Sequence, residues 1–217
     1  MSESEEDPET GLTRRSRGAS FEKAVGDYLS EELPRRTAER DWVVERKALI
    51  SDFEQYAHLS TLQRIIHEDE TRMLATEIGG DYLIKPDVTV GFTTSEGHKF
   101  LHASVSCKWT IRSDRVQNIR HEAVILTRHR RGRQPHIVAV TAEPLPTRLA
   151  AIARGTGEVD AVYHIVLDEL AEAVEAVVGN ASKRQRSRLQ IQSDTLAELR
   201  SQGRLRSFAD LTDVLTI

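Results

Sequence analysis

Two runs rich in apolar and β-branched residues lie close together in the middle of the chain, at 82–92 and 99–109. The six residues between them are Thr, Thr, Ser, Glu, Gly and His, a composition typical of a turn. Because a short turn-rich link joins antiparallel strands, we predict a β-hairpin over these residues. Shorter β-like runs follow the same pattern at 42–45, 136–141 and 159–167.

Apolar residues at helical spacing predict helices between and around these strands. Ser20 is a candidate N-cap for a helix over 20–33, and Pro34 is expected to end it. Ser51 and Glu54 match a capping box before another helix, and Ser113 is expected to cap a helix that reaches Arg128. Further helices are predicted at 146–153, 168–178, 193–201 and 208–215.

The order of these elements predicts an α/β fold. Strands that alternate with helices after an initial hairpin favour a central mixed β-sheet flanked by helices. The 217 residues are enough for one domain with a full core, which we place at 19–217. Residues 1–18 are polar, acidic at their start and without apolar periodicity, so we expect a disordered tail.

Composition says more about where the protein is located than about what it does. No apolar run approaches the ~18 residues of a membrane span, so no membrane association is expected. The N-terminus is acidic rather than a secretory signal, and Cys107 is the single cysteine, which together predict a cytoplasmic protein. The net charge is −4, but residues 1–10 hold five acids, and the remaining chain has 30 basic and 29 acidic residues. Overall charge therefore neither favours nor excludes nucleic acid as a partner.

The predicted hairpin brings an acid and a lysine to the same end of the sheet. Asp87 follows a proline early in the first strand, and Lys108 stands near the end of the second. Phosphodiester cleavage needs a metal ion held by carboxylates, and a lysine beside it can orient or deprotonate water. Nucleases of this kind carry a second acid two residues before the lysine, where this chain has Ser106. Glu122, on the next predicted helix, is the candidate replacement.

A purely structural explanation exists for each of these residues. Asp87 fits a turn, Lys108 fits the edge of a sheet, and Glu122 fits a solvated helix face paired with Arg115 or Arg120. The three together, in this order and joined by a hairpin, favour the metal-dependent nuclease site.

Arg112, Asp114 and Arg115 form a charged cluster at the expected start of a helix. Arginine donates two hydrogen bonds to guanine in the major groove, and aspartate accepts one from cytosine. Recognition helices contact bases with their first turn, so this cluster is suited to reading G·C pairs. The alternative is that Asp114 favours the helix start and the arginines contact phosphates or nearby acids.

The run from Val105 to Arg115, VSCKWTIRSDR, and its continuation to Glu122 resemble the central segment of NgoMIV-type type II restriction endonucleases. Segments 50–56, 85–88, 140–146 and 155–160 are also similar to that family. The resemblance implies a restriction-endonuclease-like (PD-(D/E)XK) fold with a displaced second acid. It also implies Mg²⁺-dependent cleavage of palindromic double-stranded DNA containing CCGG, of which GCCGGC is one candidate, leaving 5′-phosphates.

The resemblance assigns roles to individual residues. It implies that Asp87, Glu122 and the main-chain carbonyl of Cys107 bind the metal, that Lys108 is the catalytic lysine, and that Glu22 belongs to the active site. The residues implied to contact DNA are Arg112, Asp114 and Arg115 for the inner CCGG, and Arg148 for an outer base pair.

The resemblance further implies a homo-oligomer, a dimer at least and a tetramer by family pattern, with a companion DNA methyltransferase in the same cell. Two alternatives remain from the sequence. A DNA-binding protein without cleavage would not need Asp87, Lys108 and Glu122 together. A repair or defence nuclease directed by DNA structure would gain nothing from a cluster that reads bases.

Overall fold

The computed structural model describes residues 14–80, 82–155 and 157–217. Within them, six strands form one sheet in sequence order: β1 (Trp42–Arg46), β2 (Val88–Thr93), β3 (Lys99–Lys108), β4 (His136–Thr141), β5 (Ala161–His164) and β6 (Leu205–Ser207). The first three strands are antiparallel, and β3 to β6 run parallel to one another. The predicted mixed sheet is thus confirmed.

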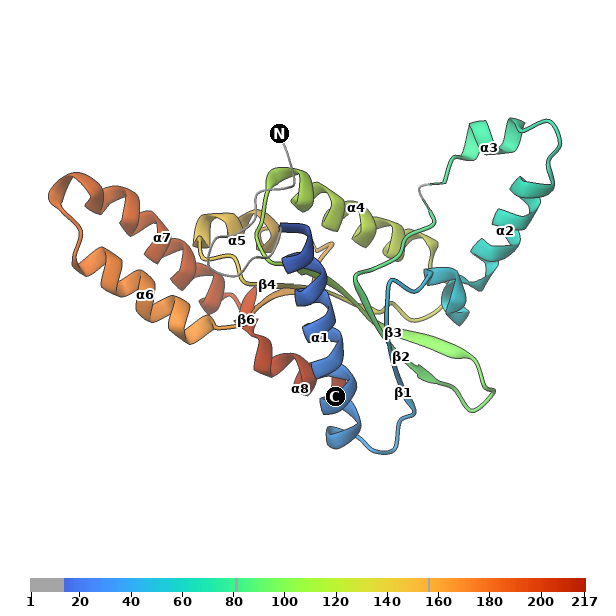
Figure 1. Cartoon of the computed structure of the whole chain (residues 1–217), viewed down its shortest axis with the longest axis horizontal. Coiled ribbons are helices and arrows are strands. Elements are labelled where there is room, and N and C mark those ends of the chain that lie inside the picture. The colour runs from blue at the N-terminus through green and yellow to red at the C-terminus, as the bar shows by residue number, and fades with distance from the viewer. Residues whose placement is uncertain (1–13, 81, 156) are drawn as a thin grey trace.

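Helices cover both faces of this sheet (Figure 1). They are α1 (Arg14–Arg36), α2 (Ala57–Glu68), α3 (Met73–Ile78), α4 (Ser113–His129), α5 (Pro146–Ala153), α6 (Leu167–Gly179), α7 (Lys183–Ser201) and α8 (Leu211–Thr216). Helices α1 and α8 pack on one face, through residues such as Leu29 and Leu215. Helices α4 and α5 pack on the other, through residues such as Ile119 and Leu149. No helix in the described ranges is apolar over enough length to cross a bilayer.

The central hairpin has the predicted antiparallel pairing, with Val88 opposite Val105. Its first strand is shorter than predicted, because residues 82–87 precede β2 as an irregular segment. Asp87 therefore stands just before β2, and Lys108 is the last residue of β3. This register places the two side chains at one end of the sheet.

Helix α1 begins at Arg14, six residues before the predicted start, so Ser20 is not its N-cap. Residues 14–18, expected to belong to a disordered tail, are instead the first turns of this helix, whereas residues 1–13 lie outside the described part. Pro34 lies inside the last turn and does not end the helix before Arg36. The fully buried Leu29 and Leu33 anchor this end of α1 in the core.

The capping box predicted at Ser51 is wrong. Two short 3-10 turns, Ile50–Asp52 and Glu54–Tyr56, come first, and α2 begins only at Ala57. Ile50, Phe53 and Tyr56 are each fully buried, and their spacing of three matches the 3-10 period. Likewise Ser113 is the first residue of α4 rather than its cap, and Arg112 takes the N-cap position without a side-chain cap bond.

The C-terminal region differs most from the prediction. One helix of 19 residues, α7, replaces the short one expected from Ser193. It packs against α6 to form a helical hairpin at one end of the molecule (Figure 1). The first half of α7 is polar, so apolar periodicity could not reveal it. The edge strand β6 was also missed, since three residues carry too little pattern.

Candidate active site and adjoining surface

Asp87 and Lys108 meet at the end of the hairpin. The Lys108 Nζ atom lies 2.5 Å from the Asp87 Oδ2 atom, and the main-chain N–H of Cys107 donates to the same oxygen at 2.8 Å. The side chains of Asp87 and Lys108 are only 17% and 19% exposed, so water screens their ion pair incompletely. The structure thus brings together the acid and the lysine that the sequence placed on neighbouring strands.

Glu122 approaches this pair from α4. Burial raises the pKa of its carboxyl to about 7; the charge of Lys108 lowers it, and that of Asp87 raises it. Helix α4 packs over the face of the sheet that carries Ser106, because Ile119 of α4 clusters with Ala139, the residue paired with Ser106. The helix therefore supplies a carboxylate beside the lysine although β3 has a serine at the expected acidic position.

Glu22, on α1, lies at the border of the same site. Its carboxylate is 13% exposed, and its Oε2 atom stands 3.3 Å from Lys47 Nζ and 3.8 Å from Arg46 Nη2, as ion pairs without aligned hydrogen bonds. Lys47 in turn donates its main-chain N–H to the carbonyl of Asp87 at 3.3 Å. Sequence reasoning missed Arg46 and Lys47, although a basic pair at the end of a strand was a usable signal.

The donor chemistry of the site fits a hard divalent cation. Asp87 and Glu122 would offer oxygen ligands to such a cation, whose positive charge would offset the repulsion between the two carboxylates. The Cys107 thiol is buried in the core, and burial raises its pKa, so it is not a soft ligand here. Within the described ranges no cluster of three or more His, Cys, Asp or Glu could hold a metal on its own. The remaining ligands would then come from water and substrate, as is usual for Mg²⁺.

A second site feature, the α4–α5 cavity, opens between the starts of these two helices and has a volume of about 530 Å³. Its lining includes three of the residues predicted to contact DNA: Arg112, Asp114 and Arg148. Arg112 and Asp114 are exposed, as side chains that meet a partner must be. The side chain of Arg115, the fourth predicted contact, lies outside the described part of the structure.

The buried side chain of Glu143 contacts both segments that line this cavity. Its side chain is fully buried, and its carboxylate accepts the main-chain N–H groups of Ile111 at 2.8 Å and Leu145 at 3.1 Å. The Arg148 Nη1 atom lies 3.5 Å from the same carboxylate. One buried acid thus fixes the residue before Arg112 and the arginine on α5. Sequence reasoning did not single it out, because nothing local distinguishes a buried glutamate from an exposed one.

Comparison with known proteins gives one family. The model of the NgoMIV restriction enzyme family matches residues 2–96 and 92–212. A curated relative, the type II restriction enzyme NgoMIV of Neisseria gonorrhoeae, is 37% identical over 76% of this chain and 69% of its own length.

Solved structures with partial likeness are also restriction endonucleases. Bse634I with cognate DNA is 14% identical, with a TM-score of 0.45, over 79% of this chain and 78% of its own. The BsaWI–DNA complex is 16% identical, with a TM-score of 0.41, and the match covers 70% of this chain but only 53% of BsaWI. PspGI bound to substrate DNA is 14% identical, with a TM-score of 0.36, over 95% of this chain and 67% of its own.

Proposed function

The chain belongs to the NgoMIV family of restriction enzymes, and from this premise we propose that it cleaves both strands of palindromic duplex DNA containing CCGG. As a member it is a type II site-specific deoxyribonuclease with the restriction-endonuclease-like fold, a DNA-binding enzyme that uses divalent metal. The observation that carries the proposal is the meeting of Asp87, Lys108 and Glu122 in a structure that also has a cavity lined by Arg112 and Arg148.

The proposed reaction is hydrolysis of a phosphodiester that leaves a 5′-phosphate. Lys108 is held by Asp87, and its ammonium can orient the attacking water. After loss of a proton to solvent, the neutral amine can accept the proton that this water gives up as it attacks the phosphorus. Glu22 forms ion pairs with Lys47 and Arg46, and Lys47 donates its main-chain N–H to the carbonyl of Asp87, so these charges border the same site.

Mg²⁺ is the proposed cofactor, with Asp87, Glu122 and the Cys107 carbonyl as its protein ligands. When bound, it supplies positive charge that stabilises the phosphate in the transition state and activates water. The protein would hold the cation through the partly buried carboxylates of Asp87 and Glu122, with Lys108 beside them. Chelation should therefore abolish cleavage, and Mg²⁺ should restore it.

Recognition of CCGG is proposed from the chemistry of the α4–α5 cavity. Arg112 can donate to guanine O6 and N7, and Asp114 can accept from cytosine N4. Arg148, which shares the cavity and is held by Glu143, is proposed to contact an outer base pair. Arg115 is proposed to read the inner bases with Arg112.

A palindrome cut in both strands requires two active sites related by a two-fold axis, so we propose at least a dimer. Because the resemblance to NgoMIV-type enzymes implies a tetramer, we propose that two such dimers associate. A host carrying the enzyme needs a methyltransferase that protects the same sequence.

Digestion of a fully sequenced plasmid tests the proposed function. Wild-type protein and Asp87→Ala are each incubated with Mg²⁺ and with a chelator, and the DNA ends are mapped. We expect discrete cuts at CCGG palindromes that need both Asp87 and Mg²⁺. Specific binding with no cutting by wild type would support a DNA-binding protein without cleavage.

A further inference from the structure

Beyond the bases, we propose that the first half of α7 binds the phosphate backbone of DNA that flanks the recognition sequence. This inference rests on the proposed function, because it extends the DNA contact surface away from the α4–α5 cavity. It assigns a role to the α6–α7 hairpin, which the cleavage and base-reading sites leave unexplained.

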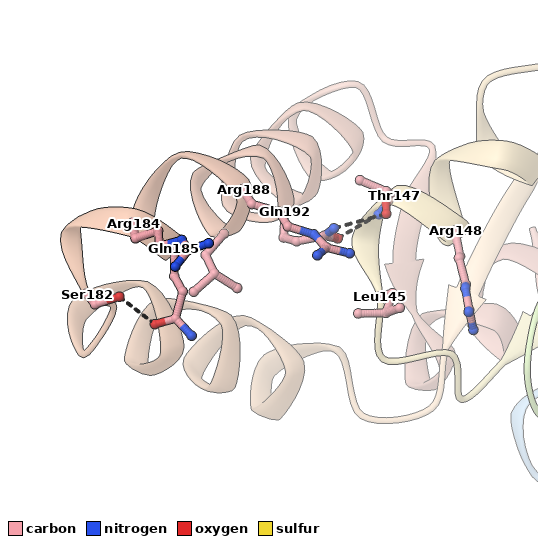
Figure 2. A pocket seen from close by; sticks show the side chains of 9 residues that line it. Leu145, Thr147, Arg148, Ser182, Arg184, Gln185, Arg188 and Gln192 are labelled. Atoms are coloured by element: carbon pink, nitrogen blue, oxygen red, sulfur yellow. Dashed lines mark hydrogen bonds between the residues drawn. The ribbon is translucent and has the colours of Figure 1, made fainter.

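The contact surface is a second, larger cavity of about 920 Å³ between α5 and α7, which we call the α5–α7 cavity. In Figure 2, Ser182, Arg184 and Gln185 lie at one end and Arg148 at the other. Arg188 and Gln192 line it between these ends. Its polar groups are mainly guanidinium and amide groups, which donate to phosphate oxygens.

The charge of this segment is of one sign. Residues 182–193 contain four cations and no acid: Lys183, Arg184, Arg186 and Arg188. All four are exposed, and within the described ranges none of the three arginines takes part in an ion pair. A solvated helix face of this length normally mixes both signs, so an anionic partner is the simplest complement.

Stability of the helix does not account for these cations. No acid stands in the first turn of α7, and cations there oppose the helix dipole. Arg200, by contrast, lies in the last turn of the same helix, where the dipole favours a cation, and it pairs with Asp168 at 3.3 Å. The cations at the start of α7 are therefore placed for something other than folding.

The two cavities form a continuous surface. Thr147 and Arg148 line both of them, so the α5–α7 cavity begins where the predicted base contacts end. The start of α5 is tied to α7 by two hydrogen bonds: the Thr147 N–H donates to Gln192 Oε1 at 3.0 Å, and Gln192 Nε2 donates to Thr147 Oγ1 at 3.1 Å. Figure 2 shows this pair between the two ends of the cavity. The basic segment is thus held at a fixed place relative to Arg148.

The spacing of the arginines suits a nucleic-acid strand. Arg184 and Arg188 are four residues apart, on the same helix face and roughly 6 Å apart along the axis. Charges along one DNA strand recur about every 3.4 Å of duplex axis, so the two guanidinium groups can reach successive or alternate phosphates. Contacts of this kind add affinity and salt dependence without sequence preference.

The test measures DNA affinity as a function of salt. Wild type, the double variant Arg184→Gln/Arg188→Gln, and Arg186→Gln are compared without divalent metal, so that no cleavage occurs. Arg186 is the matched control, because it belongs to the same turns of α7 but does not line the α5–α7 cavity. The probes are duplexes of about 12 and about 24 base pairs with GCCGGC at the centre, titrated over roughly 50 to 200 mM salt.

We expect the double variant to lower the salt slope of log affinity by about 2, because each arginine that no longer neutralises a phosphate reduces the slope by about 1. It should bind the long duplex about tenfold more weakly, and should gain little affinity from the flanks that wild type uses. Arg186→Gln should match wild type. Thermal unfolding of the double variant should be unchanged or at slightly higher temperature, since two cations leave a helix start.

An unchanged slope in the double variant, while wild type still binds and cuts GCCGGC, overturns this inference and leaves the proposed function standing. If wild type binds without preference for GCCGGC, the proposed specificity is wrong. If the double variant still has a smaller salt slope than wild type in that case, the backbone contact is supported without the proposed specificity. No binding of any duplex by wild type overturns both. A smaller oligomer in the double variant at unchanged salt slope would assign the arginines to a second copy of the chain and overturn the DNA contact.

Discussion

The polar side chains at the Asp87 site converge from separate segments of the fold, whereas those of the α4–α5 cavity extend from the starts of two helices. Glu22, Lys47, Asp87, Lys108 and Glu122 come from α1, the end of β1, the edge of β2, the end of β3 and α4. Most of them are largely shielded from solvent, and each contacts or electrostatically affects another. In the cavity, Arg112, Asp114 and Arg148 are exposed, and one buried acid, Glu143, holds Arg148 and the residue before Arg112.

This difference fits the two tasks proposed for the regions. A reaction site needs charges fixed in place with little water between them. A surface that reads bases must reach into a groove of DNA, so the ends of its side chains stay exposed. Only the backbone that carries these side chains needs to be held by the fold. The comparison predicts that substitutions in the first region change rate at constant affinity, and that those in the second change affinity and specificity.

The largest effect is expected from Asp87→Asn. This change keeps the shape of the side chain but removes the charge that holds Lys108 and any cation, so cleavage should fall about 10³-fold or more. Binding to GCCGGC without metal should change less than about threefold. Single-turnover cleavage and a binding titration measure the two quantities. The control is Asp27→Asn, because Asp27 is an exposed acid on α1. Near-normal cleavage by the Asp87→Asn variant would show that Asp87 does not belong to the reaction site.

Arg112→Ala should separate specific from non-specific binding. Removal of a bidentate contact to guanine costs about 1–3 kcal/mol, or roughly 5- to 160-fold in affinity for GCCGGC. A scrambled duplex of the same length should bind nearly as before. Arg128→Ala, at the opposite end of α4, is the matched control. Equal reductions in affinity for both duplexes would make Arg112 a phosphate contact.

Glu143→Gln tests whether one buried acid positions the α4–α5 cavity. Replacing one carboxylate oxygen by an NH₂ group sets a donor against the N–H of Ile111 or Leu145, which should destabilise the fold by about 2 kcal/mol. The preference for GCCGGC over a scrambled duplex should fall about fivefold, because Arg148 and the residue before Arg112 lose their support. Urea unfolding gives the first quantity and paired titrations the second. An unchanged preference at lower stability would limit Glu143 to a structural role.

The smallest effect on function is expected from His102, which lies away from both regions. The pKa of its ring is lowered to about 4. Burial is the largest cause and the charges of His136, Arg40 and Arg133 act in the same direction, while the hydrogen bond to the carbonyl of Leu215, 2.8 Å away, opposes them. Between pH 4 and the ordinary value of 6.5 the unfolded chain binds more protons. The free energy of unfolding should therefore fall by about 2 kcal/mol from pH 7 to pH 5.

His102→Gln removes this titration and should flatten the pH dependence by that amount in urea unfolding. His164, whose pKa is also lowered by burial, leaves a residual slope of the same sign in the variant. The ratio of specific to non-specific DNA affinity should be the same in both proteins. A pH dependence unaltered by His102→Gln would contradict a neutral, buried ring.

The sequence predicted the features that local pairing decides. The hairpin followed from two β-rich runs and a short turn, and it brought Asp87 to Lys108 as expected. Glu122 was proposed as an active-site residue because it stands on the helix that follows β3, and the structure places it within electrostatic reach of Lys108 and Asp87.

Other features depend on burial, which a single sequence does not display. The 3-10 turns before α2 arise because Ile50, Phe53 and Tyr56 all enter the core. The role of Glu143 depends on its complete burial and on its hydrogen bond with Ile111, which lies 32 residues before it. The first half of α7 has no apolar period, and its place is fixed by the contact between Gln192 and Thr147.

Cleavage of a random-sequence DNA library with Mg²⁺ tests the central proposal most directly, because one readout joins the reaction site to the reading surface. Sequencing of the fragment ends should show CCGG at nearly every cut made by wild type, and no cuts above background with Asp87→Asn. Cuts that depend on Asp87 but show no enriched sequence would contradict the proposed reading by Arg112 and Asp114, and would identify a nuclease directed by DNA structure.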